Sequence, residues 1–191
     1  MDKNKLKEYR DKRNFSKSLE PSGATTNKKK YKDIFVIQKH DASNLHYDFR
    51  LEIGSVLKSF AIPKGPSLDT SEKRLALLTE DHPLEYASFE GRIPEGNYGG
   101  GVVIVWDQGR YENINDASME EAFKNGTIEF NLKGEKISGG FALIRTKNKN
   151  WLLIKKKDRG ADKRRKPLKT EPKSVLSNKT IEDIKKEIPK K

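Results

Sequence analysis

The 191-residue sequence contains no cysteine and only three histidines. Without thiols, the chain cannot form disulfide bonds, thiolate metal sites or a cysteine nucleophile. No apolar run approaches the roughly 18 residues of a membrane-spanning helix, and the N-terminus is charged throughout. We therefore expect a soluble, intracellular protein, cytoplasmic by default. The length suffices for one domain with a real core and additional segments at its ends.

Acidic residues are scarce at both ends of the chain. Residues 1–32 hold 11 Lys and Arg against 4 Asp and Glu, and residues 155–191 hold 15 against 6. The middle, residues 33–154, holds 14 against 18, so the net charge of +12 comes from the ends. This pattern predicts a compact domain with two basic arms that engage a polyanion, DNA or RNA. Alternatively, the lysines only solubilise disordered tails, because no motif in the arms reads bases.

The middle of the chain is a succession of short apolar stretches separated by turn residues, as in all-β domains. Strands are expected at residues 35–40, 45–51, 56–62, 74–80, 102–106, 127–132, 140–145 and 151–154, and a turn at 107–109. Short helices are expected at 6–15 and 118–124, with a short final helix that contains Ile181 and Ile184. This order predicts a mainly β fold, a small antiparallel β-barrel of about eight strands with one or two short flanking helices. A barrel of this kind offers a mouth or side channel where inward polar residues can converge.

We divide the chain into three parts. Residues 1–32 form a basic N-terminal arm that packs on or near the site, residues 33–156 form the β-barrel domain, and residues 157–191 form a basic C-terminal tail with a short final helix. Thr180 and Asp183 make a capping box for that helix.

Two of the three histidines lie in residues 35–51. The alternation of apolar and polar residues places His46, Asp48 and Arg50 on one face of a strand. An antiparallel turn would bring His40 back beside His46, because facing residues of such a pair lie about 5 Å apart. Two imidazoles and a carboxylate could then bind one divalent metal, and the arginine a phosphate. The alternative is an ordinary strand whose polar face is exposed to solvent.

Two further features surround this hairpin. His82 follows a predicted strand and precedes a proline, and Tyr86 lies four residues later, so both could point at the same pocket. The segment GNYGGG at residues 96–101 leads into a strand, whereas a phosphate-binding loop opens a helix and carries a lysine with serine or threonine. We therefore expect a tight turn or bulge there.

Five long motifs carry a resemblance to a known family. The chain contains, in this order, QKHDASNLHYDFRLE, FAIPKGPSLD, EDHPLEY, FEGRIPEGNYGGGVVIVWDQG and WLLIKKKD. Together they resemble the 3'-phosphoesterase domain of bacterial DNA ligase D and its free-standing archaeal relatives, over nearly the whole chain. The length, with no polymerase or ligase region, is similar to the free-standing form.

The resemblance implies a manganese-dependent hydrolase, with Co2+ and Zn2+ as alternative metals, that heals 3' ends in DNA break repair. In the family, a 3'-terminal ribonucleoside is removed to leave a 3'-phosphate, which is then hydrolysed to a 3'-hydroxyl. The implied substrates are DNA or DNA/RNA 3' ends of a primer-template. A separate ligase and polymerase of the end-joining pathway are the implied protein partners, and no membrane is involved.

The resemblance also implies roles for single residues. The family's metal ligands match His40, His46 and Asp48, and its phosphate contacts match Arg50 and His82. Its other functional positions match Tyr86, Arg13, Glu20 and Glu80. The sequence departs from the family at Asn14, where aspartate is usual, which predicts a weaker first, diesterase step.

Two other functions fit some of these residues. His46, Asp48 and the distant His82 match the triad of non-haem iron oxygenases, but this leaves His40 and the basic arms without a purpose. Oxygen uptake with iron and 2-oxoglutarate would identify such an enzyme. The basic surface could instead hold nucleic-acid ends without catalysis, although such a module needs no metal triad. Dependence of activity on manganese would separate that module from the hydrolase.

Overall fold

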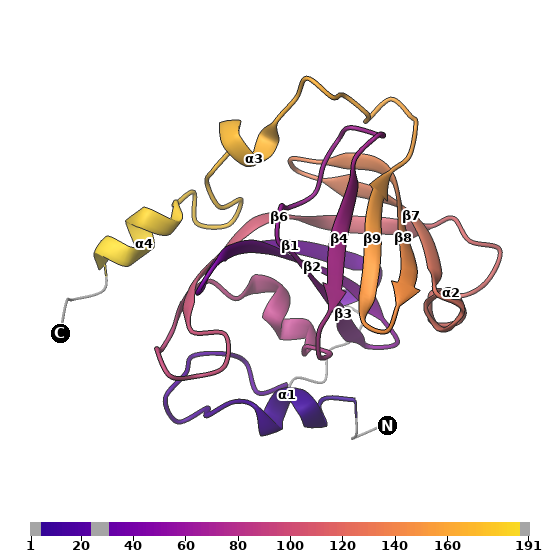
Figure 1. The fold of residues 1–191 in the computed structure, drawn as a ribbon. Coiled ribbons are helices and arrows are strands. Elements are labelled where there is room, and N and C mark those ends of the chain that lie inside the picture. Colours follow the sequence, from indigo (N-terminus) through magenta and orange to yellow (C-terminus); the bar gives the residue numbers. More distant parts are fainter. Residues whose placement is uncertain (1–4, 24–30, 188–191) are drawn as a thin grey trace.

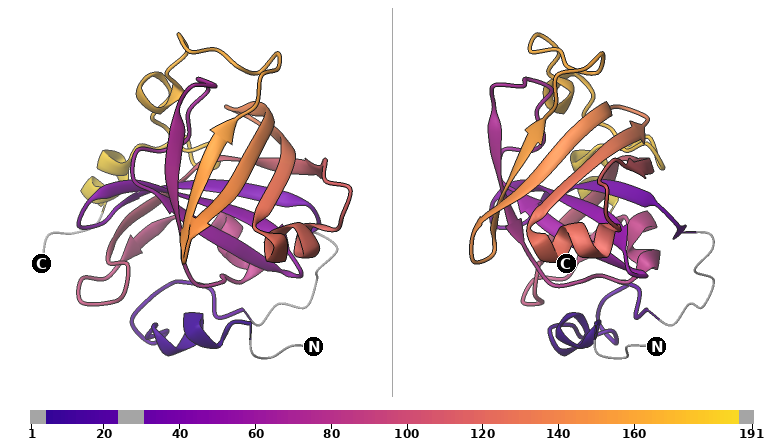
Figure 2. Two further views of the ribbon diagram at one scale, coloured as in Figure 1. Left: turned by 45° about the vertical axis from the view of Figure 1, so that its right-hand side comes forward. Right: turned by 90° about the vertical axis from the view of Figure 1, so that its right-hand side faces the viewer.

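The structure is a computed structural model that describes residues 5–23 and 31–187. Strands β1–β2–β3–β4–β9–β8–β7–β6 pair in this order, and β6 pairs back with β1, so that the sheet closes (Figures 1 and 2). The short strand β5 pairs with β6 outside this ring. All of the pairings are antiparallel, which confirms the predicted small barrel of about eight strands.

The elements are short. The strands are β1 (Ile34–Asp41), β2 (Leu45–Ile53), β3 (Val56–Ile62), β4 (Lys73–Leu78), β5 (Gly91–Ile93), β6 (Gly101–Asn113), β7 (Thr127–Gly134), β8 (Ser138–Lys147) and β9 (Asn150–Lys155). The helices are α1 (Lys7–Asp11), the 3-10 helix η2 (Leu84–Ser88), α2 (Met119–Asn125), α3 (Pro167–Thr170) and α4 (Ile181–Glu187). In the described ranges, no helix has the length and apolar character needed to span a lipid bilayer.

Alternation along the strands sorts their side chains into a barrel interior and an outer face. Phe49 and Leu51 of β2 are fully buried in the interior cluster, together with Trp106 and Trp151 from strands across the barrel. His46 and its polar neighbours on β2 therefore face outward. The predicted site of inward residues at a barrel mouth is wrong, because apolar side chains fill the interior of so small a barrel.

Two segments cover the outer wall next to β1 and β2. Tyr9 of α1 and Tyr86 of η2 form a second buried cluster with Val36 and Leu57 of the wall. Figures 1 and 2 show α1 and η2 on the same side of the barrel. The polar face of β2 thus lies next to a second core outside the barrel, which keeps water away from it.

Helix α1 is shorter than the predicted 6–15. It ends at Asp11, and the side chain of Asn14 then accepts hydrogen bonds from the backbone N–H and the hydroxyl of Ser16, at 3.1 and 2.6 Å. Such a local turn competes with continued helix. The chain is thereby redirected, so that Arg13 points toward the barrel.

Residues 107–109, predicted as a turn, continue strand β6. The register between β1 and β6 shifts after Ile37, which inserts one extra residue into β6 as a β-bulge. Gly109 is needed because an added Cβ would lie 2.1 Å from the carbonyl oxygen of Lys133 on β7. Asp107 is fully buried and accepts hydrogen bonds from the backbone N–H groups of residues 135–137. Aspartate and glycine thus serve close strand packing here and do not form a turn.

Replacing Asp107 by alanine should lower the free energy of unfolding by about 2–4 kcal/mol, because buried N–H groups would lose their acceptor. Urea unfolding measures this, with Asp116→Ala, at an exposed loop position, as the control. Equal stability of the two variants would show that the Asp107 carboxylate does not hold the turn between β7 and β8.

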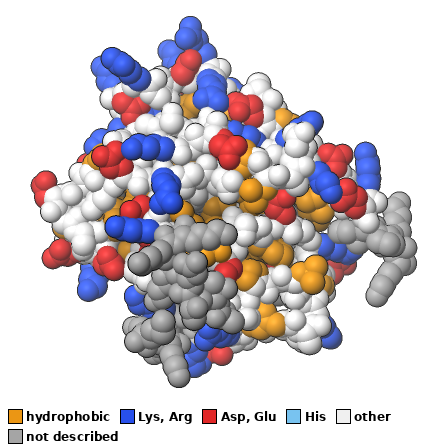
Figure 3. All heavy atoms as spheres, turned by 180° about the vertical axis from the view of Figure 1, so that it is seen from behind, with side chains coloured by type: hydrophobic (Ala, Val, Ile, Leu, Met, Phe, Trp, Pro, Cys, Tyr) orange, Lys and Arg blue, Asp and Glu red, His pale blue; other side chains and the backbone are white. Residues whose placement is uncertain are grey.

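The basic C-terminal segment folds back onto the barrel. The Val175 N–H donates to the carbonyl of Val105 at 2.9 Å, and Ile181 and Ile184 of α4 are buried against Ile104. On the face seen in Figure 3, basic side chains are interspersed with acidic ones. Residues 1–4, 24–30 and 188–191 of the predicted arms lie outside the described residues.

Candidate active site

Strands β1 and β2 bring together the three residues proposed as metal ligands. His40 faces His46 directly in the ladder, and their ring centroids are 4.7 Å apart. His40 Nδ1 lies 3.4 Å from one carboxylate oxygen of Asp48, and His46 Nε2 lies 3.7 Å from the other. One possible ligand atom from each residue falls within 4.8 Å of the others. The register predicted from the hairpin is confirmed.

Backbone carbonyls orient both imidazoles. His40 Nε2 donates to the Gly99 carbonyl at 2.8 Å, and His46 Nδ1 donates to the Asn44 carbonyl at 2.9 Å. Because a carbonyl only accepts, these nitrogens carry the proton in the neutral rings, and the lone pairs lie on the nitrogens that face Asp48. Metal-binding histidines usually have such a partner. The donor set therefore fits a divalent cation of the first transition row.

Arg50 lies on the same face of β2, and each of its three side-chain nitrogens lies close to another side chain. Its Nη2 lies 3.2 Å from Asp48, its Nε donates to Gln38 at 2.7 Å, and its Nη1 lies 3.0 Å from His82 Nδ1. Burial opposes ionisation of Asp48, but the charge of Arg50 beside it holds its pKa well below the ordinary value. Asp48 is therefore a carboxylate at neutral pH, as metal binding requires.

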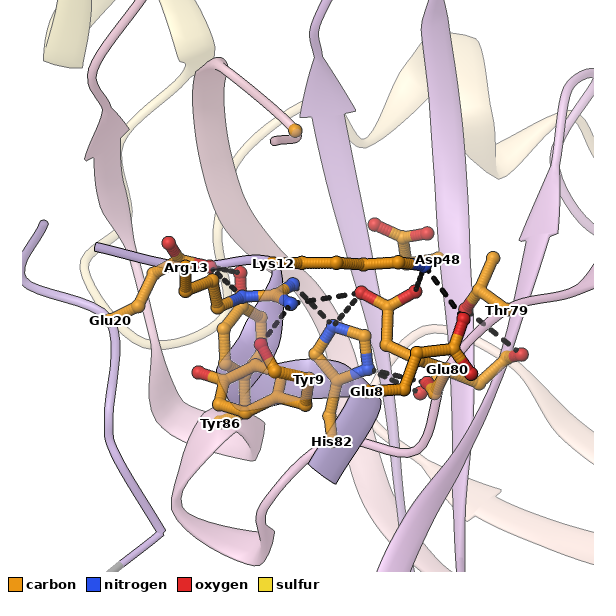
Figure 4. A network of polar contacts seen from close by, with 12 residues as sticks. Glu8, Tyr9, Lys12, Arg13, Glu20, Asp48, Thr79, Glu80, His82 and Tyr86 are labelled. Atoms are coloured by element: carbon orange, nitrogen blue, oxygen red, sulfur yellow. Dashed lines mark hydrogen bonds and ion pairs between the residues drawn. The ribbon is translucent and has the colours of Figure 1, made fainter. Parts of the chain in front are cut away.

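The N-terminal segment adds a buried cation to the site (Figure 4). Arg13 Nε donates to Glu20 at 2.8 Å, and Arg13 Nη1 donates to Glu80 at 2.9 Å. The side chains of all three are at most 4% exposed. Arg13 Nη2 lies 3.0 Å from His82 Nε2, and the Tyr86 hydroxyl donates to Glu20 at 3.0 Å. The structure thus joins the residues that the family resemblance had singled out in distant parts of the chain.

The His82 ring lies between two guanidinium groups. Burial, followed by the charges of Arg50 and Arg13, lowers the pKa of His82 well below its ordinary value. Nδ1 lies 2.9 Å from the Glu80 carbonyl and donates to it, so Nε2 accepts from Arg13. A protonated Nδ1 cannot accept from Arg50, which leaves the Nη1–H of Arg50 free for an anion. His82 is thus neutral in this state.

A pocket of about 190 Å³ opens over these groups. Its lining includes the three proposed ligands together with Arg50, Arg13, Glu80, His82 and Tyr86. A larger hollow of about 620 Å³ adjoins it, since Ala42 and Gly99 line both. The smaller space is the one that all three proposed metal ligands line.

Residues 38–145, more than half of the chain, match the family model of the DNA ligase D 3'-phosphoesterase domain. The chain belongs to this family. It is 50% identical over 184 residues to the Pseudomonas aeruginosa protein named "Multifunctional non-homologous end joining protein LigD", covering 92% of this chain and 22% of that protein. The Mycolicibacterium smegmatis protein of the same name is 48% identical over 158 residues, covering 81% of this chain and 21% of that protein. The phosphoesterase-domain chain thus spans about a fifth of these relatives.

Gln38 was not predicted as a site residue of this phosphoesterase-domain chain. It is fully buried, and its Nε2 donates to the carbonyls of Tyr86 and Phe89 at 2.9 and 3.0 Å while its Oε1 accepts from Arg50. Gln38 thereby connects η2 to β1 and orients Arg50. A signal was present in the sequence, since Gln38 directly follows the apolar run at residues 35–37, precedes His40 by two positions and shares its face.

Tyr9 and Lys12 were also missed, and nothing in the sequence pattern distinguishes them from the rest of the basic arm. The Tyr9 ring packs edge-on against His82, with centroids 5.1 Å apart, and lies 3.9 Å from the Arg13 guanidinium carbon. Lys12 Nζ lies 3.2 Å from Glu80. Asn14, where the resemblance implies that aspartate is usual, is exposed.

The geometry does not fit the oxygenase alternative. In the described part of the chain, the one group that could hold a metal is His40, His46 and Asp48. Both nitrogens of His82 are occupied by the Glu80 carbonyl and Arg13. A triad that includes His82 would require both contacts to rearrange.

Proposed function

We propose that the protein is a metal-dependent phosphoesterase that heals 3' ends at DNA breaks. It removes a 3'-terminal ribonucleoside to leave a 3'-phosphate and then hydrolyses this phosphate to a 3'-hydroxyl. The observation that carries the proposal is the convergence of His40, His46 and Asp48 with Arg50 on one pocket, in a chain of this family. Mn2+ is the proposed metal, and the same ligands also suit Co2+ and Zn2+.

The proposed substrate is a DNA or DNA/RNA 3' end of a primer-template. The names of the relatives refer to non-homologous end joining. We assign a separate ligase and polymerase of such a pathway as the protein partners. The basic ends of the chain, residues 1–32 and 157–191, would add salt-dependent attraction to the nucleic acid.

In the proposed mechanism, His40, His46 and Asp48 would hold the metal, and a metal bound there would lower the pKa of a bound water and offset negative charge on the phosphate. Arg50 binds a non-bridging phosphate oxygen through the N–H that has no acceptor in the ligand-free site. The contacts of the Arg50 guanidinium with Asp48 and Gln38 fix its orientation before the substrate binds. The phosphate is thereby held beside the metal with little loss of side-chain freedom.

Arg13 and Tyr86 help to hold Arg50 and His82 in place. Arg13 is occupied by Glu20, Glu80 and His82, so we assign it to positioning rather than to phosphate contact. Burial raises the pKa of Tyr86 well above its ordinary value, so its hydroxyl stays protonated. Its ring lies 4.9 Å from the Arg50 guanidinium carbon, a cation–π contact.

His82 has a proposed role that changes with the substrate. A bound phosphate dianion would offset the two guanidinium charges that keep the ring neutral. If Arg13 Nη2 then moved away from Nε2, His82 could take up a proton there and stabilise the phosphate or protonate the leaving oxygen.

The test is a labelled primer-template that ends in one ribonucleotide or in a 3'-phosphate, incubated with the protein and Mn2+, with EDTA as the control. We expect stepwise conversion through the 3'-phosphate to the 3'-hydroxyl. In parallel, Asn14→Asp should speed the first step and leave the second unchanged. No metal-dependent change at either end would refute the phosphoesterase and favour a module that only binds ends.

A further inference from the structure

The glycine-rich loop beside the pocket has no role in the mechanism above. Its Gly99 carbonyl accepts the hydrogen bond from His40, and Gly99 has a φ of +76°, a conformation that favours glycine. The Gly100 N–H donates to the Asn97 carbonyl at 3.0 Å and closes a turn. Tyr98 is therefore part of this closed turn, and it directly precedes Gly99, which is hydrogen-bonded to a proposed metal ligand.

Tyr98 is the most exposed aromatic side chain in the described ranges. It is 49% exposed and lines the mouth of the pocket that contains the proposed metal ligands. The other large aromatic rings near the pocket, those of Tyr9 and Tyr86, are at most 2% exposed. An exposed aromatic ring at the mouth of such a pocket offers a flat face on which a nucleobase can stack.

Two cations hold the Tyr98 ring against the N-terminal segment. Lys12 Nζ lies 4.6 Å and the Arg13 guanidinium carbon lies 5.7 Å from its centroid. These contacts orient the ring, and the exposed half of the side chain remains free to contact a ligand. The Tyr98 ring is thus held in one orientation before a ligand binds.

The spaces on the two sides of the pocket differ. On the side of Arg13 and Glu80, the N-terminal segment closes the site, and these side chains are at most 4% exposed. Beyond Gly99 lies the larger hollow of about 620 Å³, whose basic side chains Arg92 and Lys185 pair with the carboxylates of Glu95 and Asp41. A continuing strand needs this larger space, whereas a terminal nucleoside has no onward chain. Tyr98 contacts the closed side, where a terminal group fits.

We propose that the ring of Tyr98 is the stacking surface for the base of the 3'-terminal ribonucleoside. This inference rests on the proposed function and assigns a nucleobase subsite to it. Every base has an aromatic face, so stacking accepts any of the four. An enzyme that heals broken ends meets all four bases, which such a subsite allows.

The test compares Tyr98→Leu and Tyr98→Phe on two primer-templates with Mn2+. One primer ends in an intact ribonucleotide, and the other ends in a ribose that lacks its base. Tyr98→Leu should lower kcat/KM by about 10-fold on the first and leave it unchanged on the second, whereas Tyr98→Phe should retain it on both. Equal loss on both substrates, or no loss on the intact one, overturns the subsite.

A third substrate that ends in a 3'-phosphate has no terminal nucleoside, so its hydrolysis should be the same in Tyr98→Leu and the wild type. Slower hydrolysis would place the ring against the preceding base and overturn the assignment. Mn2+ affinity in Tyr98→Leu should equal that of the wild type, which shows that the Gly99–His40 contact is intact. Leu176→Ala, which removes a side chain that is 45% exposed, is the matched control. Wild-type inactivity on all three substrates would instead refute the proposed function.

Discussion

A protein with His46 replaced by alanine is expected to lose turnover and metal affinity while remaining folded. His46 is the most exposed of the three proposed ligands, with 22% of its side chain accessible, and its other nitrogen bonds only to Asn44, two residues away. Loss of a partner behind a metal ligand costs about 10–100-fold in affinity or activity, so loss of the ligand itself should cost more than about 100-fold in both.

His46 is a better probe than Asp48. Asp48 lies 3.2 Å from Arg50 and is 6% exposed, so alanine there would leave a buried cation without its partner and would confound folding with metal binding. Titration with Mn2+ and thermal unfolding with and without the metal separate the two effects. Added Mn2+ should raise the Tm of the wild type and leave that of His46→Ala unchanged, because only binding to the native state stabilises it.

Leu45→Ala is the matched control for this variant. Leu45 precedes His46 on β2, is 47% exposed and points to the other face. Its loss should change neither turnover nor Mn2+ affinity. Turnover within a few-fold of the wild type in His46→Ala would remove His46 from the metal site and with it the proposed ligand set.

The barrel and the hairpin could be predicted because both depend on local periodicity. The two-residue repeat after His46 assigns a face to each side chain, and the short turn fixes the register that places His40 opposite. No contact between distant segments is needed for this step. A cluster of potential metal ligands on one face of a hairpin can therefore be predicted from a sequence that contains few other histidines.

The location of the site and its supporting residues could not be predicted in the same way. Whether the polar face of β2 points into or out of the barrel depends on closure of all the strands, which no single strand encodes. The contacts of Arg13 with Glu80 join positions 67 residues apart, and only family resemblance indicated them. Asp107 was wrongly placed in a turn because aspartate and glycine close together, with only Gln108 between them, are turn signals, and its acceptor role appears only once β7 and β8 pack beside it.

Replacing Arg13 by leucine should cause the largest loss of stability, about 3–5 kcal/mol at neutral pH, because it removes the buried cation that contacts both Glu20 and Glu80. Glu80 then keeps only the partly exposed Lys12, at 3.2 Å. Burial raises the pKa of Glu80, but a backbone hydrogen bond and Arg13 together hold it below its ordinary value. In the wild type this group stabilises the fold above its unfolded pKa, and the contribution is lost as the pH falls through the folded pKa.

Without Arg13, burial would raise the pKa of Glu80 above its unfolded value. The contribution of Glu80 to stability would then increase, not decrease, as the pH falls. The deficit of Arg13→Leu should therefore be largest near pH 7 and shrink as the pH falls toward 4, where the buried carboxyl takes up a proton. Urea unfolding at several pH values measures this trend. Adding Glu80→Gln should recover part of the stability, and Arg10→Leu, at an exposed position of α1, is the control. A deficit independent of pH would show that loss of packing, not of charge, is responsible.

Arg13→Leu should also show whether the metal ligands and His82 can be disturbed independently. Its guanidinium contacts His82 and none of the proposed metal ligands, so Mn2+ affinity should be retained when the variant is assayed where it is folded. Turnover should fall, because His82 loses the donor that fixes its tautomer and the N-terminal segment loses its buried anchor. His46→Ala loses metal and turnover together, whereas Arg13→Leu loses turnover alone. Loss of Mn2+ affinity in Arg13→Leu would instead mean that the N-terminal segment supports the metal ligands directly.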